Sequence, residues 1–415
     1  MSAMLRSPFF SRNYGGYSTD QIAFISSNAD VRNSRVLLDP MAGQGFYLSQ
    51  VCSRTTRVYL GDINPGPLML AFLRDPALIA RSDEILRHFA EKISCLRRPV
   101  SNFEPRYCED WISPRIRQQL DDYSRAFDLS RHGDPTQGSS KFWRSPLLAR
   151  FAAAVPALAS RTIACFTESD NVTWLKRGGL EKCSDLFETL QSAAEEWRQY
   201  AVRAGAVAGR LHVSAMNASV GEFGQCPSSD LIVTSPPYAN RLDYSRMWAP
   251  ELQVCASLFH FDPSCVKSGQ IGSTVVRGGR QDDLALKRVP RFTLRALDLI
   301  RRDESAKASE SYYYPFFRNY ATATCNCFRH LADKTAPGGK LIVFIRDTTR
   351  KDILFEAGKM VEAVLREHGL TTCAKREAVI RHHVGMRRRG APATLYGLAQ
   401  REWWMAFQRP SDRHR

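Results

Sequence analysis

The sequence predicts an α/β protein whose core is a doubly wound, mostly parallel sheet. Five short apolar segments, each followed by turn residues, have the pattern of buried parallel strands. They are residues 35–38, 57–60, 210–213, 230–233 and 340–345. Stretches with helical patterning, such as 184–203 and 351–368, lie between them. Strands that alternate with helices are typical of such a sheet.

Two intervals between the predicted strands, at 74–209 and 239–338, are too long for ordinary crossovers. Both contain helix-like segments and proline or glycine breaks, so we expect two largely helical insertions. Residues 371–409 have the pattern of two strands that flank a basic turn, which predicts an antiparallel hairpin that closes the sheet. The expected parts of the chain are a first core part at 1–74, a helical insertion at 75–209, core strands at 210–238, a second insertion with the candidate target-recognition region at 239–338, and a last core part at 339–415.

The composition excludes disordered, secreted and membrane-spanning proteins and favours a polyanionic partner. Of the 415 residues, 44% are hydrophobic, which is enough to bury a sizeable core. The 58 Lys and Arg exceed the 42 Asp and Glu by 16, and such a surplus favours nucleic acid or an anionic membrane surface. No apolar run approaches the roughly 18 residues of a membrane span, and we expect no signal peptide. The 11 cysteines form no CxxC pair, which indicates a reduced, cytoplasmic protein.

The first predicted strand leads into a glycine-containing loop, Asp39-Pro-Met-Ala-Gly43-Gln-Gly45. In an open α/β sheet, ligands bind outside the carboxyl ends of the strands, where glycines let the backbone approach the ligand closely. The second strand ends at Asp62, whose carboxylate can accept hydrogen bonds from both hydroxyls of a ribose. Asn217 follows the third strand and can present its amide to an adenine edge. These residues predict a nucleoside-containing cofactor.

The fourth predicted strand ends directly in Ser235-Pro236-Pro237-Tyr238. Two prolines fix the backbone and remove its N–H donors, so carbonyl oxygens can point outward as acceptors. The serine hydroxyl adds an acceptor, and the tyrosine offers a flat stacking surface. Such a site suits an exocyclic amine on a planar ring.

In these motifs and their order, the sequence resembles the S-adenosylmethionine-dependent amino-methyltransferases of DNA, most closely the cytosine-N4 group. The resemblance covers most of the core but neither insertion. It implies a class I methyltransferase (Rossmann-like) fold and S-adenosylmethionine as methyl donor, with no metal. The implied cofactor-binding residues are Asp39, Pro40, Ala42, Gly43, Gly45, Asp62 and Asn217, the last standing where the family often has Asp. The implied catalytic residues are Ser235, Pro236, Pro237 and Tyr238.

The resemblance also implies how the reaction proceeds. Hydrogen bonds from the cytosine amine to Ser235 Oγ and the Pro236 carbonyl would stabilise the positive charge that develops on the nitrogen. The sulfonium methyl is already activated, so in-line positioning is most of what remains. Within a duplex the base must leave the stack, and Tyr238 would receive it. The implied partners are DNA and a cognate restriction endonuclease, in restriction-modification or phage defence.

Three alternatives use the same fold. Adenine-N6 methyltransferases more often carry Asp or Asn in place of Ser235. Methyltransferases of an RNA base or a protein glutamine use Asn or Asp before Pro-Pro-Tyr, and a catalytically dead nucleic-acid-binding subunit usually loses one of the two loops. A cytosine-C5 enzyme is excluded because it needs a Pro-Cys nucleophile, and Cys226-Pro227 has the reverse order and precedes the strand.

Basic segments are the candidate DNA contacts. Residues 381–389 contain Arg381, Arg387, Arg388 and Arg389 without an acid, so this segment suits a DNA groove or phosphates, or a solvated loop. Residues 276–304 mix arginines with acids, and a solvated helix face is an equal interpretation there. The segment 13–18, with two tyrosines and two glycines, suits an element that closes over the cofactor or an ordinary turn.

Overall fold

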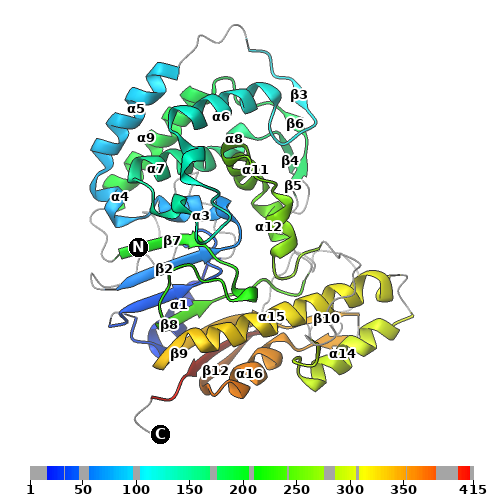
Figure 1. Ribbon diagram of the computed structural model, residues 1–415. Helices are drawn as coiled ribbons and strands as arrows, with labels where there is room; N and C mark the ends of the chain where they lie inside the picture. Colours follow the sequence, from blue (N-terminus) through cyan, green and yellow to red (C-terminus); the bar gives the residue numbers. More distant parts are fainter. Residues whose placement is uncertain are drawn as a thin grey trace. The chain divides into compact units, whose positions relative to one another are not determined.

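The structure is a computed structural model that describes residues 16–31, 33–45, 56–96, 103–168, 175–204, 210–240, 243–274, 286–304, 308–351, 353–379 and 401–411 (Figure 1). Seven strands form one sheet in the order β12-β13-β9-β8-β1-β2-β7. Their bounds are Val36–Asp39 for β1, Arg57–Asp62 for β2, Arg210–Ala215 for β7, Ser229–Thr234 for β8, Thr335–Arg346 for β9, Thr371–Val379 for β12 and Arg401–Gln408 for β13.

The strand directions confirm the predicted fold class. β1 pairs with β8, β8 with β9, and β2 with β7 in parallel, whereas β13 is antiparallel to both β9 and β12. All five predicted core strands are present, and the C-terminal pair β12–β13 is the predicted antiparallel hairpin. This doubly wound, mostly parallel sheet with its C-terminal hairpin is the class I methyltransferase, Rossmann-like fold.

The strand order reverses between β1 and β8. Along the chain, β1 is followed by β2 and β7 on one side, whereas β8 and β9 lie on the other side. The register pairs Leu37 with Leu231 and Leu38 with Ile232, so Asp39 and the residues after Thr234 lie at the same edge of the sheet. The carboxylate of Asp230 supports this register, because it accepts from the backbone N–H groups of Arg35 and Val36, both at 2.9 Å. In this fold such a switch point is where ligands bind.

Contacts divide the chain into two compact units. The first comprises Met1–Gly16, Ala42–Met216 and Ser245–Val266, and the second comprises Tyr17–Met41, Asn217–Tyr244 and Lys267–Arg415. The predicted insertions are largely helical, as expected. That the second insertion reads the target stays a prediction.

The first unit buries its core mainly between helices. Trp197 in α9 is fully buried, its indole N–H donates to the Leu73 carbonyl at 2.9 Å, and its ring lies 4.7 Å from that of Phe151. Among its described residues, the helices are α3 (Pro65–Phe72), α4 (Pro76–Ala80), α5 (Ser82–Leu96), α6 (Pro114–Ala126), α7 (Leu147–Leu158), α8 (Ser160–Ile163), α9 (Leu186–Ala204) and α11 (Ala249–Phe259). The short strands β3 (Tyr107–Cys108), β4 (Phe166–Glu168), β5 (Leu175–Arg177) and β6 (Gly179–Leu180) complete it, with 3₁₀ turns at Leu129–His132 and Lys141–Arg144.

The second unit packs its helices against β9, β12 and β13. α1 (Thr19–Asn28) contacts β13, while α16 (Ala357–Glu367) contacts β9, β12 and β13, and α15 (Tyr314–Lys334) packs against α16. α14 (Arg291–Arg302) and a π-helical turn at Ser309–Tyr313 precede α15. The strands β10 (Thr348–Arg350) and β11 (Ile353–Phe355) form a separate pair, and a 3₁₀ turn lies at Ala218–Val220. The short helices α10 (Tyr244–Met247) and α12 (Ser264–Gly269) are at the unit boundaries.

Two predicted helices start later than expected. The helix predicted at 184–203 begins at Leu186, because the Asp185 carboxylate accepts from the Phe187 and Glu188 N–H groups and thus caps it. The start of the helix predicted at 351–368 is wrong: residues Ile353–Phe355 are the strand β11, and α16 begins at Ala357. There the Asp347 carboxylate accepts from the N–H of Gly358 at 2.9 Å.

Candidate functional site

In the first unit, the glycine loop is held on the end of β2. Ala42 N donates to the Gly61 carbonyl at 2.7 Å, and Gly43 N donates to Asp62 Oδ2 at 3.1 Å. The other carboxylate oxygen of Asp62 accepts from Asn64 N at 2.9 Å. Asp62 therefore links the loop to the turn that begins α3, besides any role toward a ligand.

The two loop glycines serve different purposes. Both have left-handed backbones, with φ of +52° at Gly43 and +59° at Gly45. A Cβ on Gly43 would meet no atom within 4 Å, so this face of the loop is open. A Cβ on Gly45 would lie 2.2 Å from Leu60 Cδ1, so Gly45 permits close packing of the loop on β2. Gly43 is thus the position where a ligand can approach the backbone.

Burial raises the pKa of Asp62 to about 6, although hydrogen bonds from the N–H groups of Asn64, Gly43 and Ile63 oppose the shift. The carboxylate is therefore ionised near neutral pH, but burial of its charge lowers the stability of the folded protein. A ligand that donates hydroxyl groups to it would stabilise the ionised form.

In the second unit, Asp39 lies at the end of β1 and is 3% exposed. Its Oδ2 accepts from the Tyr17 hydroxyl and its Oδ1 from Met41 N, both at 3.1 Å. The Tyr17 ring packs 5.3 Å from that of Phe344 in β9. The end of the segment predicted to close over the cofactor thus reaches Asp39, whereas its residues 13–15 lie outside the described part of the chain.

The Ser-Pro-Pro-Tyr loop leaves β8 beside Asp39, with Pro236 buried and Ser235, Pro237 and Tyr238 half-buried. The Tyr238 hydroxyl donates to Glu402 Oε1 at 2.6 Å, and Tyr238 N donates to the Tyr244 hydroxyl at 3.4 Å. Burial is the main cause that raises the pKa of Tyr238 well above its ordinary value, and the charge of Glu402 adds to this rise. A hydrogen bond from the Ser235 side chain to the Tyr238 oxygen partly opposes this rise.

Glu402 is a site residue that the sequence analysis missed. It lies in β13, is 9% exposed, and its Oε2 accepts from Trp404 Nε1 at 2.8 Å and Gln21 Nε2 at 3.4 Å. Arg346 is its neighbour in β9, where burial lowers the pKa of the guanidinium while the charges of Tyr238, Glu402 and Tyr244 raise it. The sequence feature that could have identified Glu402 is a carboxylate near the start of a mostly apolar strand.

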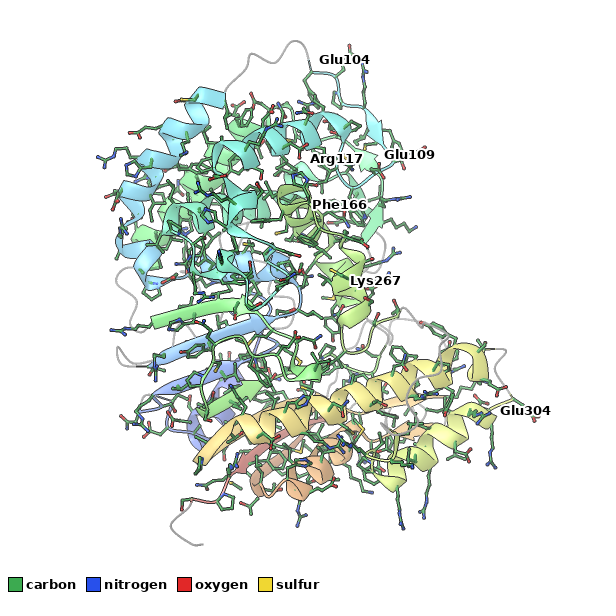
Figure 2. All side chains as sticks on the ribbon, in the orientation of Figure 1. Glu104, Glu109, Arg117, Phe166, Lys267 and Glu304 are labelled. Atoms are coloured by element: carbon green, nitrogen blue, oxygen red, sulfur yellow. The ribbon has the colours of Figure 1, made fainter. Side chains whose placement is uncertain are left out.

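A segment of the second insertion packs against the Ser-Pro-Pro-Tyr loop. A Cβ on Gly272, whose φ is +73°, would lie 3.7 Å from the Tyr238 carbonyl oxygen and 3.8 Å from Pro237 Cβ. The buried Asp243 carboxylate accepts from Thr274 Oγ1 at 3.2 Å and pairs with Lys267 Nζ at 3.4 Å; Lys267 is labelled in Figure 2. These contacts connect residues 267–274 to the loop.

The remaining predicted site residues lie apart from this cluster or outside the described residues. Asn217 exchanges backbone hydrogen bonds with Glu222, and its Oδ1 accepts from Ser219 Oγ at 2.6 Å. Its contact with an adenine stays a prediction. Arg381, Arg387, Arg388 and Arg389 lie outside the described residues.

Neither a metal centre nor a membrane span is found in the part of the chain that the structure describes. There, no three His, Cys, Asp or Glu side chains gather as metal ligands would, and no helix is both long and apolar enough to cross a bilayer. Cys325 and Cys327 are buried in α15.

Of the comparisons with known proteins, the one with solved structures gives matches. No family model matches the chain, and no curated protein sequence matches it. Two solved structures of the rRNA methyltransferase aviRa from Streptomyces viridochromogenes share 10% sequence identity with it, each with a TM-score of 0.30. Both matches cover 98% of this chain, and they cover 89% and 90% of the aviRa chains. So low a TM-score adds nothing to the fold assignment, which rests on the strand order.

Substituting alanine at the two loop glycines should separate packing from ligand access. Gly43→Ala should lower the free energy of unfolding by about 1–2 kcal/mol, the cost of a left-handed backbone. Gly45→Ala should cost about 1–3 kcal/mol more, because its Cβ must displace Leu60. Chemical denaturation of both variants measures the difference in unfolding free energy. Equal losses would show that the Leu60 side chain can move away without cost.

Proposed function

We propose that this chain is an S-adenosylmethionine-dependent methyltransferase that modifies the exocyclic N4 amine of cytosine in DNA. The observation that carries the proposal is the Ser-Pro-Pro-Tyr loop, which leaves β8 at the switch point of the sheet, beside Asp39 at the end of β1. The fold provides the place for a ligand, and the loop provides acceptors and an aromatic ring for a planar amine.

The residues of the glycine loop and of β2 fit the cofactor. Gly43 leaves open space beside a left-handed backbone, and the largely buried Asp62 carboxylate is suited to ribose hydroxyls. The cofactor, when bound, supplies an activated sulfonium methyl group. We assign its binding to Asp39, Pro40, Ala42, Gly43, Gly45, Asp62 and Asn217.

The catalytic loop would act on the base by orientation and by stabilisation of charge. Ser235 Oγ and the Pro236 carbonyl accept the two amine hydrogens, and this favours a nitrogen whose lone pair points away from the ring. Pro237 fixes the loop, and the Tyr238 ring offers a stacking surface. Adenine N6, or a base in RNA, would present a similar amine, so these substrates remain the alternatives that the product analysis below tests.

An exposed basic face in the second unit supports DNA as the partner. In α14, Arg291, Arg295 and Arg302 are exposed and lie on one side of the helix, because their spacings of four and seven residues match its period. One acid, Asp298, shares this side and pairs with Arg302 at 3.0 Å. Thr293, Leu297 and Ile300 are buried on the opposite side. Figure 2 shows nitrogen-ended side chains projecting from α14 on the side away from α15. A restriction endonuclease as second partner, and a cytoplasmic location, complete the proposal.

The raised pKa of Asp62 should make cofactor affinity and stability depend on pH in opposite directions. Between pH 4 and 6 the folded protein keeps a proton on Asp62 that the unfolded chain has lost, so the unfolding free energy of the free protein should fall as pH rises, by up to about 3 kcal/mol. Cofactor affinity should rise over the same window, because ribose hydroxyls bind the ionised form. Denaturation and calorimetry of wild type and Asp62→Asn isolate this component, which the variant should lack; identical pH profiles would remove Asp62 from the site.

Product analysis tests the base and the nucleic acid together. Mass spectrometry of digested DNA after reaction should find N4-methylcytosine, and Ser235→Ala should lower turnover by about 100-fold with unchanged cofactor affinity, because the lost interaction strengthens as the nitrogen becomes positive. N6-methyladenine as the only product would overturn the base assignment. Methylated RNA with unmodified DNA would overturn the substrate class.

Salt dependence tests the basic face of α14. Arg291→Ala together with Arg295→Ala should reduce the slope of log affinity for DNA against log salt by about 1.8, since each phosphate contact contributes about 0.9. The matched control is Arg81→Ala together with Arg198→Ala, two exposed arginines of the first unit that pair with Glu84 and Glu195. A slope unchanged in both double variants would move the contacts elsewhere, with Arg387, Arg388 and Arg389 as the next set to replace.

A further inference from the structure

The glycine loop of the first unit is in contact with a buried arginine. Arg74 is 2% exposed and lies just after α3. Its Nη1 donates to the main-chain carbonyl of Gln44 at 2.6 Å, and its Nη2 donates to the side-chain oxygen of the same residue at 3.5 Å. Nη1 also donates to the Leu70 carbonyl in α3 at 3.4 Å. The guanidinium therefore joins the end of α3 to the residue between Gly43 and Gly45.

The peptide group between Gln44 and Gly45 has both of its polar atoms engaged inside the unit. Its carbonyl accepts from Arg74, and its N–H donates to the Ala42 carbonyl at 2.8 Å. The second of these bonds closes a turn over residues 42–45, and the open position Gly43 is the first central residue of that turn. A peptide is planar, so hydrogen bonds at both of its ends fix its orientation. Arg74 thus helps to hold the turn that presents Gly43.

The corner from which Arg74 projects, residues 73–75, is itself fixed. The Leu73 carbonyl accepts from the indole N–H of Trp197 at 2.9 Å. The Asp75 carboxylate accepts from Ala77 N at 2.9 Å and so caps α4. The main-chain N–H of Arg74 donates to the Ala71 carbonyl at 3.1 Å. Arg74 therefore reaches the loop from a rigid base, as a positioning group must.

A buried guanidinium is costly, and an apolar side chain would fill the same space without that cost. Burial accordingly lowers the pKa of Arg74, although an arginine stays charged at neutral pH. What the charged group adds is a set of donors directed at the oxygen atoms of Gln44. A charge-assisted hydrogen bond is stronger than one between neutral groups, so Arg74 can hold the loop where an apolar residue could not.

We propose that Arg74 is a positioning residue for the cofactor, which holds the glycine loop in its binding conformation before the cofactor binds. This inference rests on the proposed function, in which Gly43 is the place where the cofactor approaches the backbone. Arg74 is buried and acts through Gln44, so it is not a catalytic residue. Preorganisation of a loop lowers the ordering cost of binding. The effect of Arg74 should therefore appear in cofactor affinity and not in the chemical step.

Two variants of the full-length protein test the proposal. Arg74→Met removes the donors and keeps an unbranched side chain, whereas Arg74→Lys keeps the charge and a donor. A loop that holds its binding conformation one-tenth of the time raises the apparent Kd about 10-fold, and we expect this increase for S-adenosylmethionine in Arg74→Met and about 3-fold in Arg74→Lys, by calorimetry. At saturating cofactor, kcat should be unchanged while the KM for the cofactor rises. In the cofactor-free protein, the Gly45 amide hydrogen should exchange with solvent about 10-fold faster in Arg74→Met.

The matched control is Arg150→Met, the same substitution at another arginine beside this corner. The Arg150 guanidinium lies 4.5 Å from the centre of the Phe72 ring and pairs with Asp75 at 4.0 Å. Among the described residues, Arg150 makes no hydrogen bond to the glycine loop. Its loss should lower the free energy of unfolding and leave both the cofactor affinity and the Gly45 exchange rate at their wild-type values.

The outcomes separate this proposal from the proposed function. Wild-type affinity and exchange in Arg74→Met would overturn the positioning role and leave the methyltransferase proposal standing. Equal losses of affinity in Arg74→Met and Arg150→Met would also overturn it, because they would report a general loss of stability. A wild-type protein that binds no S-adenosylmethionine would overturn the proposed function, whereas faster Gly45 exchange in Arg74→Met would still show that Arg74 holds the loop.

Discussion

The parallel pairing of β1 with β8 is the constraint on which the candidate site depends. Asp230 accepts from two consecutive N–H groups at the start of β1, and the register that follows brings the ends of both strands to one edge of the sheet. A shift by one residue would reverse which side chains face each side of the sheet. Asp39 and Ser235 therefore owe their common location to backbone pairing, although 196 positions separate them in the chain.

Local patterns were sufficient to predict the five core strands, the C-terminal hairpin and the two loops, because each depends on a few consecutive residues. The apolar run of β8 followed by Ser-Pro-Pro-Tyr identifies both a buried strand and its exit. The contacts that complete the site are different in kind. Tyr238 meets Glu402 across 164 positions, and no spacing rule links a loop to a strand that far away. The helix starts at Leu186 and Ala357 were also missed. Asp185 caps the first helix, and the strand β11 precedes the second.

Asp39 and Asp62 stabilise the glycine loop, besides their proposed role in cofactor binding. Asp39 and Asp62 each accept hydrogen bonds from the backbone of the loop they would present to a ligand. These hydrogen bonds hold the loop in one conformation, and they also restrict the side-chain rotation of each carboxylate. A site built in this way is largely preorganised, which lowers the ordering cost of binding but makes the carboxylates hard to exchange for other side chains.

The position of Glu402 in β13 has a consequence for synthesis of the protein. A chain emerging from the ribosome folds its earlier segments first, so β8, β9 and the Ser-Pro-Pro-Tyr loop are made well before residues 401–408. Until that strand arrives, β9 has an unpaired edge and the Tyr238 hydroxyl lacks its carboxylate partner. The nascent chain therefore has the Ser-Pro-Pro-Tyr loop in sequence but not in its final geometry, and the later synthesis of β13 completes it.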